Sequence, residues 1–170
     1  MKIGRVTLSD RASAGIYEDK SGPEIERVIR DLLDAHAIFV ARLMPDEQPQ
    51  LEAVLVELSD RENCDLILTT GGTGPAPRDI TPEATRAILD RELPGFGEMI
   101  RAASFHHVPT AILSRATAGT RGRTLIINLP GNPRAIAECL APIIPAIREG
   151  LRHLGADATR SESYEPNHSK

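Results

Sequence analysis

The sequence predicts an α/β fold of three layers, α/β/α, with a mostly parallel central sheet. Two observations predict it. Short apolar segments alternate along the chain with segments whose apolar residues recur at helical spacing, which is typical of repeated strand–helix units. In addition, residues 65–70 lack in–out alternation and stop at glycines, as expected of a strand that is buried on both faces of a parallel sheet. Ligands of such folds bind beyond the carboxyl ends of the strands.

The first half of the chain contains three predicted strands and two predicted helices. Residues 2–8 and 37–44 are short apolar segments, and together with residues 65–70 they are the predicted strands. Ser21 and Glu24 have the spacing of a capping box, and apolar residues follow at helical spacing as far as Leu33. The same spacing over residues 51–58 predicts the second helix.

The second half contains three more helices and two more strands. Thr81 is a candidate N-cap with Pro82 at the first helical position, which predicts a helix that includes Leu89. Another helix is predicted over residues 96–106. Residues 110–116 and 124–129 are strand-like, and we expect them to pair around a turn at residues 119–122. The apolar helical face of residues 135–151 contains Pro142 and Pro145, which should kink or split the last helix.

The length of 170 residues is near the usual size of one domain. No internal repeat divides the chain, so we expect residues 1–154 to form a single domain. Residues 155–170 are polar and lack periodicity, which predicts a mobile C-terminal tail.

Composition and charge argue against several classes of protein. The net charge is −4, and the basic residues are scattered along the chain rather than clustered, which does not favour a nucleic-acid interface. The five aromatic residues are too dispersed for a base-stacking platform. No apolar stretch reaches the roughly 18 residues of a membrane helix, and no export signal is visible at the amino terminus. We therefore expect a cytoplasmic protein that binds neither nucleic acid nor membranes.

The two cysteines, Cys64 and Cys139, are too far apart in the sequence for a metal-binding motif, and they form no disulfide framework. We expect both to be buried, reduced thiols. The five histidines have no acidic or cysteine partners at ligand spacing, so none is assigned to a metal site.

The most unusual loop follows the buried strand and reads Thr-Thr-Gly-Gly-Thr-Gly-Pro-Ala-Pro-Arg-Asp over residues 69–79. Its three glycines leave backbone amides uncovered, which suits the close approach of phosphate oxygens. The loop lacks the lysine of a P-loop and the third glycine of the dinucleotide-binding motif, and it contains no nucleophile elbow. The structural alternative is a tight turn between a strand and a helix.

Two acidic residues lie beside this candidate phosphate site. Asp79 follows the glycine loop, and Asp46 follows the second predicted strand. Two acids beside a phosphate site indicate a divalent cation, and Mg²⁺ is suited to one or two carboxylates together with phosphate oxygens and water. Each acid also has a structural alternative, because Asp46 after Pro45 could cap a helix and Asp79 could cap the next turn.

Three further polar segments occur at strand ends. The Pro/Gly-rich segment of residues 128–133 closes a strand and opens the last helix, whose amino terminus could bind an anion or a sugar, although a plain turn would also explain it. Ser9 with Asp10, and Ser114 with Arg115, could contact a ligand. Taken singly, such residues more often belong to turns or to the surface.

These motifs resemble those of the molybdopterin adenylyltransferases of molybdenum-cofactor synthesis, the MogA type, and are similar to the plant and gephyrin G domains. The resemblance extends over roughly residues 3–153. Its most specific string is Gly-Gly-Thr-Gly followed by Arg-Asp and by Thr-Pro-Glu-Ala-Thr. Molybdate-insertion proteins and MoaB-like proteins share versions of this string, but the additional domains of an insertion protein are not visible here, which favours the adenylyltransferase.

The resemblance implies a homotrimeric cytosolic enzyme that transfers AMP from Mg-ATP to molybdopterin and releases pyrophosphate. It also implies hand-over of the product to a molybdate-insertion protein. The terminal phosphate of molybdopterin is the nucleophile, which agrees with the lack of a recognisable nucleophilic triad. The alternatives are a molybdate-insertion protein, a MoaB-like molybdopterin-binding protein without adenylyl transfer, and a catalytically silent scaffold.

The resemblance also assigns residues to the site. The two essential acids of the family, which would also hold Mg²⁺, fall on Asp46 and Asp79. The residues expected to bind ATP or molybdopterin are Ser9, Asp10, Thr70, Gly71, Gly72, Thr73, Gly74, Ser114, Asn128, Pro130, Gly131 and Asn132.

Overall fold

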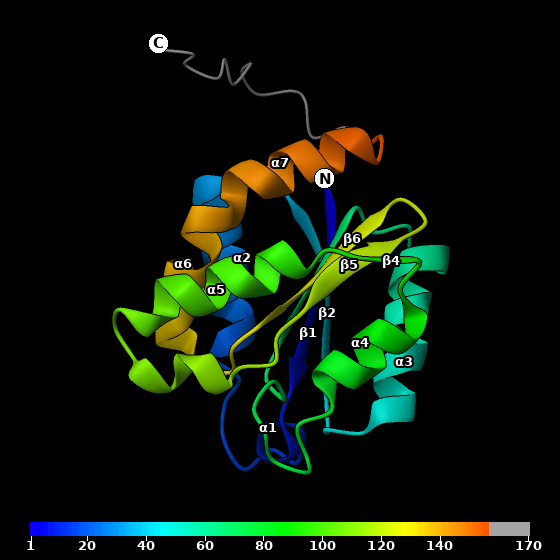
Figure 1. Cartoon of the computed structure of the whole chain (residues 1–170). Helices are drawn as coiled ribbons and strands as arrows, with labels where there is room; N and C mark the ends of the chain where they lie inside the picture. Colours follow the sequence, from blue (N-terminus) through cyan, green and yellow to red (C-terminus); the bar gives the residue numbers. More distant parts are fainter. Residues whose placement is uncertain (157–170) are drawn as a thin grey trace.

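The computed structural model describes residues 1–156 and contains a six-stranded sheet in the order β2-β1-β3-β6-β5-β4 (Figure 1). The strands β1 (Lys2–Leu8), β2 (Ile38–Met44), β3 (Leu66–Thr70) and β6 (Thr124–Leu129) are parallel. At one edge β5 (Ala118–Arg121) and the two-residue β4 (Arg91–Glu92) pair antiparallel. The predicted α/β fold with a mostly parallel sheet is confirmed.

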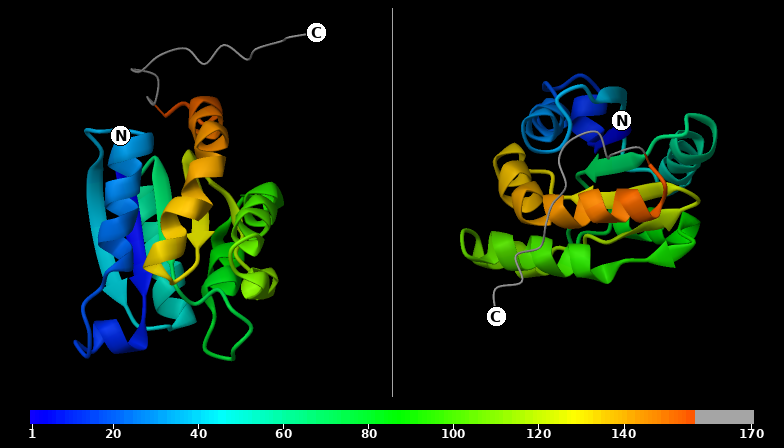
Figure 2. Two further views of the ribbon diagram at one scale, coloured as in Figure 1. Left: turned by 90° about the vertical axis from the view of Figure 1, so that its left-hand side faces the viewer. Right: turned by 90° about the horizontal axis from the view of Figure 1, so that it is seen from above.

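Helices cover both faces of the sheet. One face packs against α2 (Ser21–Leu32), α5 (Pro94–Phe105), α6 (Pro133–Leu140) and α7 (Ile144–His153). The other face packs against α3 (Gln48–Val56), which continues into a π-helical turn (Glu57–Arg61), and against α4 (Thr81–Ile88). Figure 2 shows α2 and α6 side by side on the first face.

The core explains why β3 lacks in–out alternation in its sequence. All five residues of β3 and all six of β6 are buried. Leu66 and Leu68 belong to the apolar cluster beneath α2 and α6, whereas Ile67 between them belongs to the cluster beneath α3 and α4. Each face of these central strands therefore needs apolar side chains, as the sequence predicted.

One predicted strand is wrong. Residues 110–116 do not form a strand, because Pro109–Leu113 is a 3₁₀ helix and β5 begins only at Ala118. The observed strand β5 therefore lies largely within residues 119–122, which were predicted to form the turn. The chain reverses two residues later than expected, where Gly122 has a φ of +54°. The strand that pairs directly with residues 124–129 is therefore β5 rather than residues 110–116.

Two predicted helix caps are also wrong, because their hydroxyls make tertiary contacts instead. The Ser21 hydroxyl donates to the Gly131 carbonyl at 2.9 Å, and the backbone amides of Ser21 and Gly22 donate to the Asp19 carboxylate. The Thr81 hydroxyl donates to the Gly71 carbonyl at 2.9 Å. A further departure is the short helix α1 (Asp10–Ser13), which lies where a loop was expected.

Two other expectations, the break in the last helix and the burial of both cysteines, are confirmed. The last helix is split where Pro142 lies, because a 3₁₀ turn (Ala141–Ile143) separates α6 from α7. Cys64 and Cys139 are buried and free. Of the predicted tail, Gly155 and Ala156 are described, and the Ala156 side chain is buried. Residues 157–170 lie outside the described part of the chain. Within the described part, no helix is long and apolar enough to cross a membrane.

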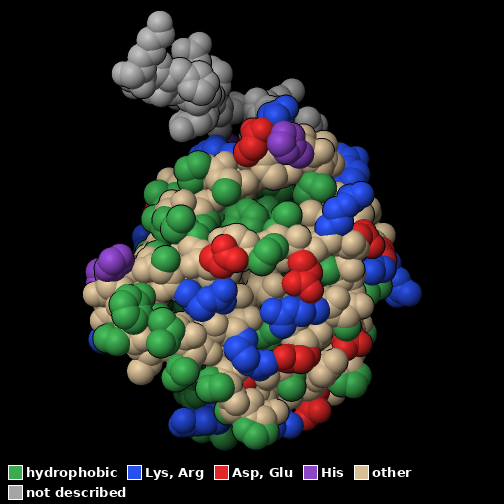
Figure 3. Space-filling model, in the orientation of Figure 1, with side chains coloured by type: hydrophobic (Ala, Val, Ile, Leu, Met, Phe, Trp, Pro, Cys, Tyr) green, Lys and Arg blue, Asp and Glu red, His purple; other side chains and the backbone are tan. Residues whose placement is uncertain are grey.

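Several large apolar side chains are exposed on α5, on the 3₁₀ helix that follows it and on the segment between the two. They appear as green groups at the left of Figure 3. The residues are Met99, Phe105, Val108, Ile112 and Leu113.

Candidate functional site

The candidate site lies at the carboxyl ends of β1, β2, β3 and β6, at the lower end of the sheet in Figure 1. These strands are neighbours in the sheet, so the loops that follow them meet. The Ser9 amide donates to the Met44 carbonyl at 3.0 Å, and the Thr70 hydroxyl donates to the Pro130 carbonyl at 2.7 Å. The topology therefore brings together four segments that are far apart in the sequence.

Asp10 and Asp46 are joined by reciprocal hydrogen bonds. The Asp10 amide donates to the Asp46 carboxylate at 3.3 Å, and the Asp46 amide donates to the Asp10 carboxylate at 3.1 Å. Burial raises the pKa of Asp46, and the negative charges of Asp10 and Asp79 raise it further. A carboxylate with a raised pKa among other acids gains stability from a nearby cation, which suits a metal ligand.

Arg78 links the acids at the rim of the site. Its guanidinium donates to both carboxylate oxygens of Asp10, at 2.8 Å and 2.9 Å from one nitrogen, and to Glu47 at 3.0 Å. Hydrogen bonding to Arg78 lowers the pKa of Asp10. Asp10 is therefore held as an anion by a protein partner, whereas no arginine among residues 1–156 donates to the Asp46 carboxylate.

The glycines after β3 are required by the local geometry. Gly71 and Gly72 have φ values of +97° and +62°, a region that side chains disfavour. A Cβ atom at Gly71 would lie 2.3 Å from the Leu8 carbonyl oxygen. A Cβ atom at Gly72 would lie 2.4 Å from the Thr81 hydroxyl and 2.8 Å from the Asp46 carboxylate. The loop backbone thus passes directly against the carboxylate of Asp46.

Asp79 faces back into the same loop. Its carboxylate accepts a hydrogen bond from the Ala76 amide at 2.9 Å, and a Cβ atom at Gly74 would lie 2.7 Å from the same oxygen. Asp79 does cap a turn, as the structural alternative suggested, but the turn is the one that precedes it. Asp46 does not cap α3, since the residue at the cap position is Glu47.

A pocket of about 590 Å³ lies next to these loops. Its walls come from the end of β1, from α1 and the segment before α2, from the end of β3, and from the start of α6. It is lined by Thr7, Leu8, Ser9, Ala12, Tyr17, Glu18, Asp19, Lys20, Ser21, Thr70, Gly131 and Pro133. Ser9, Thr70 and Gly131 are among the predicted binding residues. The Ser9 hydroxyl lies 2.8 Å from the Tyr17 hydroxyl.

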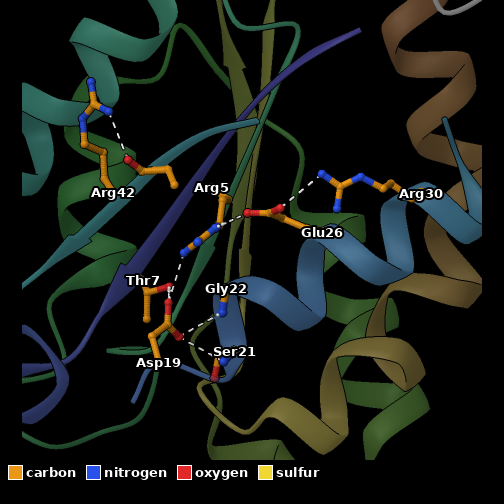
Figure 4. Close-up of polar contacts among 9 residues, drawn as sticks. Arg5, Thr7, Asp19, Ser21, Gly22, Glu26, Arg30 and Arg42 are labelled. Carbon is orange, nitrogen blue, oxygen red and sulfur yellow. Dashed lines mark hydrogen bonds and ion pairs between the residues drawn. The ribbon is translucent and has the colours of Figure 1, made fainter. Parts of the chain in front are cut away.

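The wall formed by residues 17–21 was missed by sequence reasoning. Figure 4 shows how Asp19 fixes it: the carboxylate accepts hydrogen bonds from Arg5 at 3.0 Å, from the Thr7 hydroxyl at 2.8 Å and from the first two amides of α2. Arg5 is also paired with Glu26 at 2.8 Å. A signal was available in the polar segment that ends at Lys20, one of only three lysines in the chain.

The remaining predicted binding residues have other contacts in this structure. Asn128 is fully buried, and its amide group bonds to the Thr69 and Thr85 hydroxyls at 3.0 Å and 2.9 Å. Asn132 caps α6 by accepting a hydrogen bond from the Arg134 amide. The Ser114 hydroxyl accepts from the Ala116 amide at 3.3 Å. Asn128 therefore lies behind the glycine loop rather than on the pocket surface.

The residue types present fit Mg²⁺. Within residues 1–156 no group of three or more histidine, cysteine or acidic side chains is arranged to enclose a metal ion by itself. Mg²⁺ does not need such a cage, because one or two carboxylates together with substrate phosphates and water complete its coordination. Asp46 and Asp79 both lie against the glycine loop, at Gly72 and at Gly74, and are suited to that arrangement.

Comparisons with known proteins identify the family to which this chain belongs. The sequence model of a family described as "probable molybdopterin binding domain" matches residues 4–149. The chain is 55% identical over 140 residues to the molybdopterin adenylyltransferase of Haemophilus influenzae, covering 82% of this chain and 71% of that protein. It is 52% identical over 145 residues to the molybdopterin adenylyltransferase of Helicobacter pylori, covering 85% of this chain and 82% of that protein.

A solved structure of the molybdopterin biosynthesis enzyme MoaB from Thermus thermophilus superimposes with a TM-score of 0.82 at 44% sequence identity. The match covers 90% of this chain and 95% of that one.

Proposed function

Because this chain belongs to the family of probable molybdopterin-binding domains, we propose that it is a molybdopterin adenylyltransferase of molybdenum-cofactor biosynthesis. The reaction is the transfer of AMP from ATP to molybdopterin. The observation that carries the proposal is the contact between the glycine loop and an acid, since the backbone at Gly72 lies against the Asp46 carboxylate. The candidate phosphate-binding loop is thus in contact with the candidate metal ligand Asp46.

The transfer would need no covalent protein intermediate. An oxygen of the terminal phosphate of molybdopterin attacks the α-phosphorus of ATP, a new P–O bond forms, and the P–O bond to pyrophosphate breaks. The work left to the protein is to position the two phosphates and to stabilise the charge that develops between them.

Each part of the site has a role in this proposal. Mg²⁺ held by Asp46 and Asp79 would neutralise charge on the phosphates of ATP. The amides of residues 72–74 would donate to phosphoryl oxygens as pyrophosphate leaves. The pocket beside Ser9, Thr70 and Gly131 would hold the substrates, and Lys20 at its edge would add a positive charge.

We further propose a homotrimer, a cytoplasmic location, a single domain over residues 1–154 and hand-over of the product to a molybdate-insertion protein. These four statements depend on the resemblance to the family and on the sequence pattern.

The deciding experiment is an assay of pyrophosphate release from ATP and Mg²⁺, with and without molybdopterin. We expect release that depends on molybdopterin and forms adenylyl-molybdopterin in equal amount. Tight molybdopterin binding without any release would favour a MoaB-like binding protein, and loss of both would reject the proposal.

A further inference from the structure

Arg115 extends from the chain after the 3₁₀ helix of Pro109–Leu113 into the glycine loop. Its backbone amide donates to the Thr73 carbonyl at 2.8 Å. Its side chain donates through Nε to the Gly74 carbonyl at 2.8 Å and through Nη2 to the Asp79 carbonyl at 2.6 Å. The remaining nitrogen, Nη1, forms an ion pair with Glu83 on α4. One residue thus contacts both ends of the segment from Gly74 to Asp79.

The segment between these two ends is also held from outside by Arg78, which pairs with Asp10 at 2.8 Å and with Glu47 at 3.0 Å. Residues 75–78 are exposed. The internal hydrogen bonds of this turn are the mutual pair between Ala76 and Asp79, both at 2.9 Å. Because residues 75–78 are exposed and do not anchor the turn in the core, the position of the Asp79 carboxylate depends on the ion pairs of Arg78 and on where the two ends of the turn are held.

The position of Arg115 is itself fixed from α5. Arg101 donates through Nη1 to the Ser114 carbonyl at 3.2 Å and to the Ala116 carbonyl at 3.1 Å. The backbone on either side of Arg115 is therefore held by a second arginine, and a rigid connection runs from α5 through residues 114–116 to the loop.

We infer that Arg115 is a positioning residue, which holds the turn of residues 74–79 closed and thereby places the Asp79 carboxylate opposite Asp46. The inference rests on the proposed function, because it takes Asp79 as a ligand for the Mg²⁺ of the substrate. It assigns to Arg115 no contact with substrate.

The geometry requires the guanidinium group. A planar fork can donate to two carbonyls in fixed directions at once, whereas a lysine ammonium is a single point with three rotatable donors. Arg115→Lys would keep the charge beside Glu83 but could not span the carbonyls of Gly74 and Asp79 together. The conservative substitution therefore separates the role of the charge from the role of the fork.

The first test measures amide hydrogen exchange in the full-length, ligand-free protein. We expect the amides of Ala76 and Asp79 to exchange about tenfold faster in Arg115→Ala, as follows from losing two hydrogen bonds of ordinary net strength, and severalfold faster in Arg115→Lys. Glu83→Gln removes only the ion pair and is expected to leave exchange unchanged. Unchanged exchange in both Arg115 variants would overturn the inference.

The second test measures how the initial rate of pyrophosphate release depends on Mg²⁺ concentration. We expect the half-saturating Mg²⁺ concentration to rise about tenfold in Arg115→Ala, with part of the maximal rate recovered at high Mg²⁺. Arg121→Ala is the matched control, because Arg121 also pairs with an acid, Asp60, and donates to a carbonyl, that of Ile88, but on α4 and β5 away from the loop.

The two tests separate the possible failures. Faster exchange with an unchanged Mg²⁺ requirement would make Arg115 merely structural and would overturn its positioning role. If the wild-type protein transfers no AMP, the proposed function fails, while the exchange measurement still decides whether Arg115 holds the turn. If Arg115→Ala does not fold, the comparison of Arg115→Lys with Arg121→Ala decides both questions.

Discussion

At Asp46, both burial and the charges of neighbouring acids disfavour the ionised carboxylate. Its folded-state pKa lies above the value in the unfolded chain, because burial and two neighbouring acids disfavour the anion. The folded state therefore binds more protons than the unfolded state between these two pKa values, and the free energy of unfolding falls as pH rises through this window. Above this window the loss of stability remains.

We predict that Asp46→Asn raises the melting temperature at pH 7 and abolishes AMP transfer. The stability gain should disappear below the ordinary aspartate range near pH 4, because the side chain at position 46 is then neutral in the wild type as well as in the variant. Melting curves of both proteins from pH 3 to pH 8 test this. A lower melting temperature of Asp46→Asn at pH 7 would show that the hydrogen bonds of the carboxylate outweigh the cost of its burial.

Asp79→Asn is predicted to lower the transfer rate by at least 100-fold while molybdopterin still binds. The amide keeps the shape of the side chain and can still accept from the Ala76 amide, but it weakens the metal site. Single-turnover transfer together with molybdopterin titration separates the two effects. Transfer at a rate near that of the wild type in excess Mg²⁺ would remove Asp79 from the mechanism.

Asn128 is predicted to stabilise the protein from behind the site. Asn128→Ala leaves the buried Thr69 and Thr85 hydroxyls and the Thr117 amide without their partner, which should lower the free energy of unfolding by about 3 kcal/mol. Urea unfolding measures this loss. Ligand affinity that falls with no loss of stability would instead support the sequence-based assignment of Asn128 to the binding site.

At the scale of single elements, the loop from β3 to α4 determines where the acids lie. Gly74→Ala requires no unusual φ, yet its Cβ would lie 2.7 Å from the Asp79 carboxylate, so the carboxylate must move and lose its bond to Ala76. We predict a large loss of transfer with a stability loss of about 1 kcal/mol. Gly95→Ala is the control, since nothing lies within 4 Å of its Cβ position. Equal transfer rates in both variants would contradict the prediction.

The elements that the sequence predicted well are those whose pattern arises from burial. The strand at residues 66–70, the helix after Ser21 and the break at Pro142 follow from apolar periodicity and from the rigid proline ring. The wrong strand over residues 110–116 has a similar cause, because apolar residues there were read as core. Ile112 and Leu113 are in fact exposed, so their apolar side chains do not indicate a buried strand.

The site was predicted only as far as local motifs reach. The glycine loop, Asp46 and Asp79 are recognisable from residue type and position at strand ends. The tertiary contact of the Ser21 hydroxyl was not predictable, because a serine hydroxyl at this place in the sequence can either cap the helix or bond to a distant carbonyl. The bracing role of Arg115 was also out of reach, since it depends on a contact with a loop about 40 residues earlier in the chain.

At the scale of the whole molecule, we predict a homotrimer. The warrant is the resemblance to the family. Sedimentation equilibrium at micromolar concentration is the direct measurement, and three times the 18.4 kDa mass of the chain is the expected result. A monomer would count against this expectation but not against the α/β fold.

The strand order also has a consequence for synthesis on the ribosome. β6 pairs with β3 in the middle of the sheet, yet Thr70 and Pro130 are 60 residues apart. At about 5–20 residues per second, the edge of β3 waits roughly 3 to 12 seconds for its partner. During that time a strand whose five residues are all buried in the folded protein presents unpaired backbone groups, which are a template for association with other chains. Nascent chains stalled before Thr124 should therefore need a chaperone, whereas chains that have extruded Leu129 should not.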